Sequence, residues 1–108
     1  MGLNNNQDTF RDFVVDQLAS IPELACRRMF GGAGLYSGET FFAILYDGRL
    51  YFHTSEATRS RYLRAGMDCF RPSAKQALKR YFEVPAGVIE DREELVGWAR
   101  EALATVSP

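Results

Sequence analysis

The chain has 108 residues, of which 46% are hydrophobic and 25% charged, and its formal net charge is −1. This length favours one domain, since domains cluster near about 100–150 residues, and the composition excludes wholesale disorder and collagen-like repeats. Near-neutrality also excludes a polybasic protein whose whole surface binds nucleic acid.

The amino terminus and the cysteines bear on the cellular location. Met1–Gln7 is polar, so we predict a flexible leader over residues 1–7 and a single domain over residues 8–106. No secretory signal is recognisable, and no apolar run reaches the ~20 residues of a membrane span. Cys26 and Cys69 stand far apart, which favours two buried, reduced thiols, with a disulfide as the alternative. We expect a cytoplasmic protein without a membrane partner.

The first predicted element is a helix that precedes Pro22. Its apolar stripe has the i, i+3, i+4 spacing of one helix face. The stripe consists of Phe10, Phe13, Val14, Gln17, Leu18 and Ile21. Asp8 or Thr9 is expected to cap the first turn, and Pro22 to end the helix.

Strands and tight turns are predicted between Cys26 and Thr54. Ser37-Gly38 and Asp47-Gly48 tolerate the positive φ angles of two-residue hairpin turns. The strands around them are Gly34–Tyr36, Thr40–Tyr46 and Arg49–Thr54, which form an antiparallel meander. The middle strand is apolar on both faces, so one face is expected to pack on the first helix and the other on later elements or another subunit.

A second helix is predicted over Ser55–Ala65. Thr54 or Ser55 is expected to cap it, Gly66 to end it in the left-handed conformation, and Met67 to supply the apolar contact of that ending. Two short strands follow, over Cys69–Arg71 and Arg80–Val84. The segment between them is predicted as either a helical turn or a loop.

The last helix is predicted from near Asp91 to about Thr105. Asp91 and Glu94 form a capping pattern, and apolar residues from Leu95 to Val106 recur at helical spacing. The order of elements predicts an α+β fold, in which helices at the amino terminus, middle and carboxyl terminus pack on an antiparallel sheet of about five to six strands.

Two local features are candidates for chemistry. His53 is the single histidine of the chain, and with two cysteines it falls short of the four ligands of a structural zinc site. Met29–Gly34 is rich in glycine, but it carries no phosphate-loop spacing and leads into a strand, so we interpret it as a tight turn or bulge. We expect no catalytic residue, no metal and no cofactor. A small-molecule site around Gly31–Gly34 and His53 remains an alternative.

Charge is segregated along the chain. The candidate basic patch consists of Arg59, Arg61, Arg64, Arg71, Lys75, Lys79 and Arg80. Residues 83–101 are mainly acidic. The two stretches are predicted either to be solvated faces that partly pair with each other, or to provide a basic surface for an acidic partner or a phosphate backbone.

The aromatic content exceeds what so small a core needs. Tyrosine and phenylalanine not used in the core favour an oligomer or partner interface, where tyrosine and arginine are enriched. The residues in question are Tyr36, Phe42, Tyr46, Tyr51, Tyr62 and Tyr81.

The segment Arg27–Tyr36, with the later strings Asp47–Phe52 and Tyr81–Pro85, resembles the TfoX N-terminal domain family. Its most specific part is the R-x-M-F-G-G-x-G-L-Y string. The motif residues are Arg28, Met29, Phe30, Gly31, Gly32, Gly34 and Tyr36.

The resemblance implies an α+β domain without a recognised catalytic centre, related to a regulator of competence for DNA uptake that acts on gene expression. That regulator carries a second domain, so we expect this chain to be a stand-alone, single-domain member. The function predicted is a non-enzymatic regulatory domain that contacts a protein partner or itself, as a homodimer. Direct nucleic-acid binding through the basic patch is the alternative.

Overall fold

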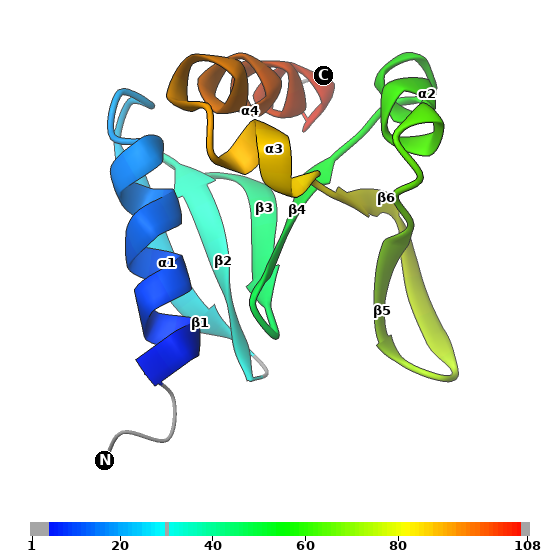
Figure 1. Cartoon of the computed structure of the whole chain (residues 1–108), viewed down its shortest axis with the longest axis horizontal. Helices are drawn as coiled ribbons and strands as arrows, with labels where there is room; N and C mark the ends of the chain where they lie inside the picture. Colours follow the sequence, from blue (N-terminus) through cyan, green and yellow to red (C-terminus); the bar gives the residue numbers. More distant parts are fainter. Residues whose placement is uncertain (1–4, 30, 107–108) are drawn as a thin grey trace.

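The computed structural model describes residues 5–29 and 31–106, with side chains from residue 8 onward. This part of the chain contains four helices and six strands, in the order α1-β1-β2-β3-β4-α2-β5-β6-α3-α4 (Figure 1). Their bounds are α1 Asn5–Gln17, β1 Leu24–Met29, β2 Gly32–Ser37, β3 Thr40–Tyr46, β4 Arg49–His53, α2 Glu56–Arg64, β5 Cys69–Ser73, β6 Gln76–Glu83, α3 Ala86–Ile89 and α4 Arg92–Val106.

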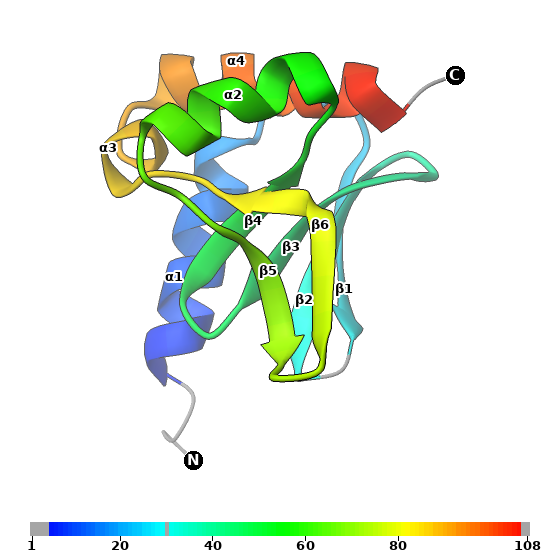
Figure 2. The ribbon, with the colours of Figure 1, turned by 90° about the vertical axis from the view of Figure 1, so that its right-hand side faces the viewer.

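The six strands form one antiparallel sheet with the order β1-β2-β3-β4-β6-β5. The first four are a meander, and the β5–β6 hairpin is then added through β6, which lies beside β4 (Figures 1 and 2). The predicted α+β class, the antiparallel sheet and the three helical regions are confirmed.

One face of the sheet packs against α1 and α4. Val14 of α1, Leu18 in the turn that follows it, and Leu95 and Ala99 of α4 are completely buried, in one cluster with sheet residues such as Leu35. The helices therefore cover a single side of the sheet, and the core lies between the two layers. The other side of the sheet has no helix layer of this kind.

The bounds of α1 differ from the prediction. The helix already begins at Asn5, so Asp8 and Thr9 lie inside it rather than capping it, and the last three residues of the predicted leader are helical. It ends at Gln17 because the chain turns there, with the Ile21 amide bonding the Leu18 carbonyl at 2.9 Å. Residues 1–4 of the predicted leader lie outside the described residues.

The predicted stripe of α1 is wrong at one position. Phe13 is 42% exposed, whereas Val14, Leu18 and Ile21 are buried as predicted. Gln17 is also buried, because its side-chain amide donates to the Ile89 carbonyl of α3 at 3.0 Å.

The predicted tight turns are present in the meander. Asp47 and Gly48 both have positive φ angles, of 54° and 70°, as a two-residue turn with the hairpin twist requires. In the β2–β3 turn the positive φ belongs to Gly38, and the loop is Gly38-Glu39 rather than Ser37-Gly38, because Ser37 still pairs with Thr40.

Helix α2 begins and ends as predicted. Ser55 caps it, accepting the Thr58 amide at 3.2 Å. At the other end Gly66 has a φ of 80°, and the amides of Gly66 and Met67 bond the carbonyls of Leu63 and Tyr62. This is the glycine-terminated ending expected from the sequence.

The segment that the sequence left undecided is neither a helical turn nor a long loop. Strands β5 and β6 extend through it and leave a two-residue turn at Ala74-Lys75. Helix α3, which follows Pro85, was not predicted. Helix α4 was, and its cap is Asp91, whose carboxylate accepts the Glu94 amide at 3.1 Å.

The cysteine prediction is half right. Both thiols are free, and Cys69 is buried, but Cys26 is exposed on β1. Strand β1 is an edge strand whose central residues Cys26, Arg27 and Arg28 all face solvent, so a residue there is not enclosed on all sides.

Candidate functional site

The side of the sheet opposite α1 and α4 carries a continuous group of aromatic side chains. We call it the outer aromatic face. Its half-buried members surround Ile44, Tyr51 and Phe70, which are buried. They are Tyr36, Phe41, Tyr46, Tyr81 and, at the end of β4 where its ring also reaches the carboxyl-terminal end of α4, His53.

Four of these rings, from β2, β3, β6 and β4, contact one another in a continuous row on this face of the sheet. The ring centroids of Tyr36 and Phe41 lie 5.2 Å apart, those of Phe41 and Tyr81 5.6 Å, and those of Tyr81 and His53 5.1 Å. The guanidinium of Arg27 lies over Tyr36, 4.9 Å from its centroid. Such spacings are those of favourable aromatic and cation–π contacts.

A bulge in β3 places Phe41 in this row. Leu35 pairs with Ala43 and the next residue, Tyr36, pairs with Phe41, so Phe42 is an extra residue in β3. Phe42 and Ala43 consequently both lie in the core, while Phe41 lies beside Tyr36 on the outer aromatic face. This explains why the strand is apolar on both faces.

The glycines of the motif give these rings room. A Cβ atom on Gly34 would lie 2.7 Å from both the Met29 sulfur and a ring carbon of Phe41. One on Gly32 would lie 2.4 Å from the Leu45 carbonyl oxygen and 3.0 Å from the Tyr46 ring. Gly31 has a φ of 78°, in the turn between β1 and β2. The glycine string therefore permits a turn and a close approach of neighbouring groups.

The remaining motif residues are distributed around the same region. Arg28 is exposed on β1, Met29 is half-buried beside Gly34, and Tyr36 belongs to the outer aromatic face. Phe30 lies outside the described residues. A cleft of about 610 Å³ separates the β1–β2 and β3–β4 turns from α1, and Arg28, Gly31 and Gly32 line it.

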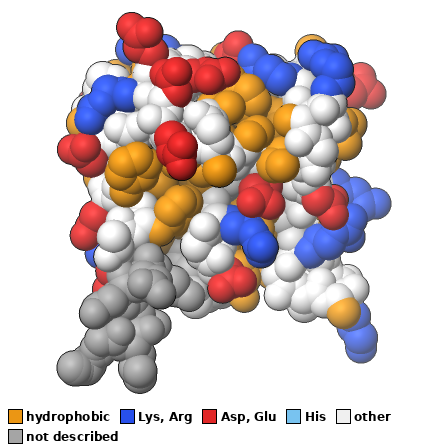
Figure 3. Space-filling model, viewed as in Figure 1, with side chains coloured by type: hydrophobic (Ala, Val, Ile, Leu, Met, Phe, Trp, Pro, Cys, Tyr) orange, Lys and Arg blue, Asp and Glu red, His pale blue; other side chains and the backbone are white. Residues whose placement is uncertain are grey.

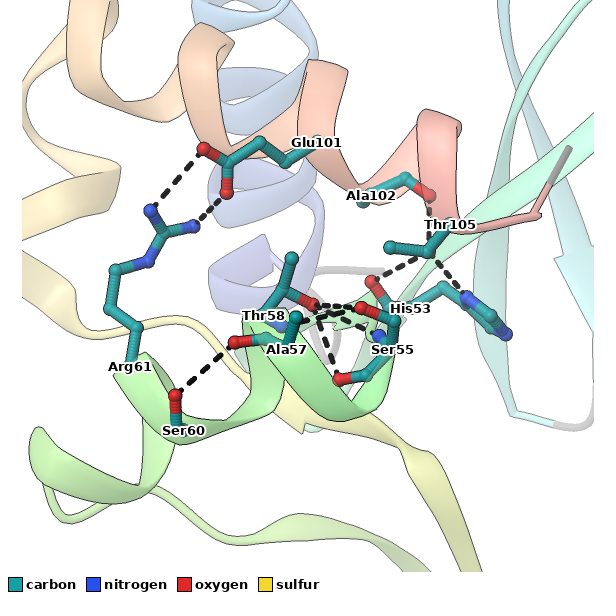
Figure 4. Close-up of polar contacts among 9 residues, drawn as sticks. All are labelled: His53, Ser55, Ala57, Thr58, Ser60, Arg61, Glu101, Ala102 and Thr105. Atoms are coloured by element: carbon teal, nitrogen blue, oxygen red, sulfur yellow. Dashed lines mark hydrogen bonds and ion pairs between the residues drawn. The ribbon is translucent and has the colours of Figure 1, made fainter.

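His53 joins β4 to the carboxyl-terminal end of α4. Its Nδ1 atom lies 2.6 Å from the Thr105 hydroxyl, whose own proton has the Ala102 carbonyl as a partner at 2.6 Å (Figure 4). Burial lowers the pKa of His53, and the positive charges of Arg80 and Arg59 lower it further. The imidazole is therefore a structural contact between the sheet and α4, and its surroundings disfavour the charged form of the ring.

This burial predicts a pH dependence of stability. Unfolded His53 has a pKa near 6.5 and the folded pKa is lower, so below pH 6.5 the unfolded state takes up the proton more readily. The free energy of unfolding should thus fall as the pH drops from about 7 to about 5.5, where most carboxylates are still ionised. Urea unfolding at about pH 7 and at about pH 5.5 measures this decrease in the free energy of unfolding. In His53→Asn, which keeps a polar group towards Thr105, the decrease should be smaller; an equal decrease in both proteins would contradict the assignment.

The predicted basic patch does not form a single surface. Arg61 turns towards α4, where it pairs with Glu101 and its guanidinium lies 3.9 Å from the Trp98 ring centroid (Figure 4). Arg59 donates to the Thr54 hydroxyl at 3.1 Å, and Arg71 pairs with Asp68 at 3.3 Å. The other four cations are exposed and form no ion pair with any residue that the structure describes. They are Arg64, Lys75, Lys79 and Arg80.

The aromatic residues singled out from the sequence are divided between the core and the outer aromatic face. Phe42 and Tyr62 belong to the core, and Tyr51 is buried beneath Phe70. Tyr36, Tyr46 and Tyr81 lie on the outer aromatic face. Sequence reasoning missed Phe41. The signal that could have found it is that the strand Thr40–Tyr46 is apolar on both faces, so the face away from the helices must also pack against other groups.

Within residues 5–29 and 31–106, no group of three or more His, Cys, Asp or Glu side chains is placed to hold a metal ion. No helix in this part of the chain is both long enough and apolar enough to cross a membrane.

Comparison with known proteins identifies the family. The family model described as TfoX N-terminal domain matches residues 16–106, which include all strands of the sheet. The chain belongs to the TfoX N-terminal domain family. In this TfoX domain, the motif that carried the resemblance forms the β1–β2 hairpin and contributes Tyr36 to the outer aromatic face.

One relative is the DNA transformation protein TfoX1 of Aliivibrio fischeri. It is 29% identical over 79 residues, which cover 71% of this chain and 38% of the relative. The chain thus matches little more than a third of that protein.

Proposed function

We propose that this TfoX domain is a non-enzymatic regulatory domain that acts through protein contacts, and that the outer aromatic face is its docking surface. The occupant that we propose is a second copy of the chain. The observation that carries the proposal is the row of half-buried rings on the side of the sheet that α1 and α4 do not cover.

The composition of this face supports self-association. Tyrosine and arginine are the residue types most often found at the energetic centres of protein interfaces. Arg27 already lies over the Tyr36 ring within the chain. In a two-fold dimer the same patch meets itself, so the arginine of one copy and the rings of the other provide the same pairing across the interface.

The proposed non-enzymatic character rests on His53. Its Nδ1 atom is engaged by Thr105 and its ring by Tyr81, and its lowered pKa reflects that enclosed position. The relative's name refers to DNA transformation. We extend that process to this chain as the one in which the regulatory contact operates, with transcription of DNA-uptake genes as the output.

Size-exclusion chromatography with light scattering tests the dimer. The wild-type chain is expected to show twice the mass of one chain and to dissociate on dilution. Tyr36→Glu replaces a ring of the aromatic row with a carboxylate and should weaken dimerisation at least about tenfold, since the ring contact is lost and a charge is costly to desolvate at the centre of an interface.

The matched control is Phe13→Glu, which makes the same kind of change at an exposed aromatic residue on α1. It is expected to leave the dimer intact, while circular dichroism verifies the fold of both variants. A wild-type monomer at the highest soluble concentration, or equal weakening by both variants, would refute self-docking on this face.

The regulatory part has its own test in the native cell. Removal of the gene is expected to change the transcript levels of DNA-uptake genes, and the Tyr36→Glu allele should reproduce that change. Unaltered transcripts after removal would contradict the regulatory role without bearing on the dimer.

A further inference from the structure

Strands β5 and β6 form a two-stranded ribbon that is free of the rest of the sheet over most of its length. Strand β4 pairs with β6 only at Tyr81, Phe82 and Glu83. Residues 76–79 therefore have β5 as their only strand partner. Figures 1 and 2 show the hairpin extending away from the helices.

The ribbon is positively charged, and its one carboxylate is that of Glu83, the last residue of β6, which pairs with Arg49 of β4. No Asp or Glu occurs from Cys69 to Phe82, while Arg71, Lys75, Lys79 and Arg80 are all exposed. Arg64, at the end of α2, is also exposed. In Figure 3 a group of acidic side chains lies at the upper left, where α4 begins, and the lower right-hand edge, over the hairpin, carries mainly basic ones, although both signs occur elsewhere on this face.

The cations that the fold leaves unpaired are those of the ribbon and its base. Arg61 is held by α4 and Arg59 by Thr54, whereas Arg64, Lys75, Lys79 and Arg80 have no carboxylate partner among the described residues. Leu78, 37% exposed, is the one large apolar side chain exposed on the described ribbon. A protein interface is built around buried apolar anchors, so a single leucine among cations fits a phosphate backbone better.

We infer that the β5–β6 ribbon binds duplex DNA through its phosphate backbone, with Arg64, Lys75, Lys79 and Arg80 as the contacting cations. A two-stranded ribbon fits the width of the major groove, and register irregularities in β5–β6 increase its twist. The acidic first turn of α4 lies on the other side of the molecule from the hairpin (Figure 1), so the charge separation orients the domain with the ribbon towards the duplex. This inference does not depend on self-association.

Fluorescence anisotropy with a labelled duplex of about 20 base pairs and mixed sequence tests the inference. Binding is expected at about 20 mM salt, and the logarithm of the binding constant should fall against that of the salt concentration with a slope of about −4 for four phosphate contacts. Lys75→Glu/Lys79→Glu should lower the affinity at least about tenfold and reduce the slope by about 2.

The control makes the same change in net charge elsewhere. Arg28→Glu/Arg100→Glu reverses two exposed cations, one on α4 and one on β1, the edge strand opposite β5. It should retain most of the affinity. Four outcomes would each overturn the inference. Two of them are the absence of binding at low salt and an equal loss of affinity in the two double variants. The other two are tighter binding of the corresponding single strand than of the duplex, and displacement of the duplex from the protein by polyglutamate of equal charge.

Discussion

Replacing Gly32 with alanine is expected to lower the free energy of unfolding by about 1–3 kcal/mol, the range of overpacked sites. The added Cβ would lie 2.4 Å from the Leu45 carbonyl oxygen, which is backbone and belongs to the neighbouring strand β3. The strand itself must therefore shift, and the Tyr46 ring, 3.0 Å away, must shift with it. Urea unfolding followed by circular dichroism measures the loss.

A glycine without such neighbours provides the control. Gly97 lies inside α4, and a Cβ there would meet nothing within 4 Å. Gly97→Ala should raise the free energy of unfolding by about 0.5–1 kcal/mol, because alanine is the better helix former. Equal effects of the two substitutions, in sign and size, would show that close packing of β2 on β3 is not what requires glycine in the motif.

The contrast between the two glycines shows what can be predicted from the sequence. The Asp47-Gly48 turn, the ending of α2 at Gly66 and the Asp91 cap each depend on a few neighbouring residues, and all three are confirmed. The need for glycine at position 32 depends on Leu45, thirteen residues away and on another strand. A single sequence contains no information on that approach.

The same distinction between local and distant contacts applies to the burial of single residues and to strand register. Gln17 is buried because it bonds the carbonyl of Ile89 in α3, a helix that the sequence did not predict. The extra residue of β3 at Phe42 arises from pairing with β2. A continuous apolar run therefore predicts that a strand has two apolar faces, but the register that sends Phe41 outward is decided by the packed sheet.

Charge patterning has a similar limit. Proximity in sequence placed Arg59, Arg61 and Arg64 in one basic patch. The 3.6-residue repeat of α2, however, places Arg59 on the opposite side of the helix from Arg61. Arg61 and Arg64 share a helix face, but only Arg61 contacts α4. Arg61 lies against α4, and Arg64 remains exposed. Arg61 and Glu101 form one ion pair between the basic and the acidic stretch, as one of the two predictions expects. The alternative, a basic surface for an acidic partner or a phosphate backbone, requires cations without such a partner, and Arg64, Lys75, Lys79 and Arg80 are of that kind among the described residues.

Replacing Arg61 with alanine is expected to lower the free energy of unfolding by about 1–2 kcal/mol, chiefly through loss of the cation–π contact. The guanidinium lies 3.9 Å from the Trp98 ring centroid, and this contact connects α2 to α4. Arg64→Ala, three residues further along α2, removes an exposed arginine without such a contact and should change the stability by less than about 0.5 kcal/mol.

Glu101→Gln separates the ring contact from the ion pair. About half of the Glu101 side chain is exposed, and an exposed pair contributes about 0–1 kcal/mol, so this variant should lose less than Arg61→Ala. If Glu101→Gln loses as much stability as Arg61→Ala, the carboxylate rather than the ring holds Arg61.

The two arginines are also expected to differ in DNA binding. Because the Arg61 side chain is held against α4, Arg61→Ala should leave the affinity for duplex DNA within about twofold. Arg64→Ala should lower that affinity and reduce the salt slope by about 1. The two arginines are thus expected to have opposite profiles, with Arg61 contributing to stability and Arg64 to the affinity for duplex DNA.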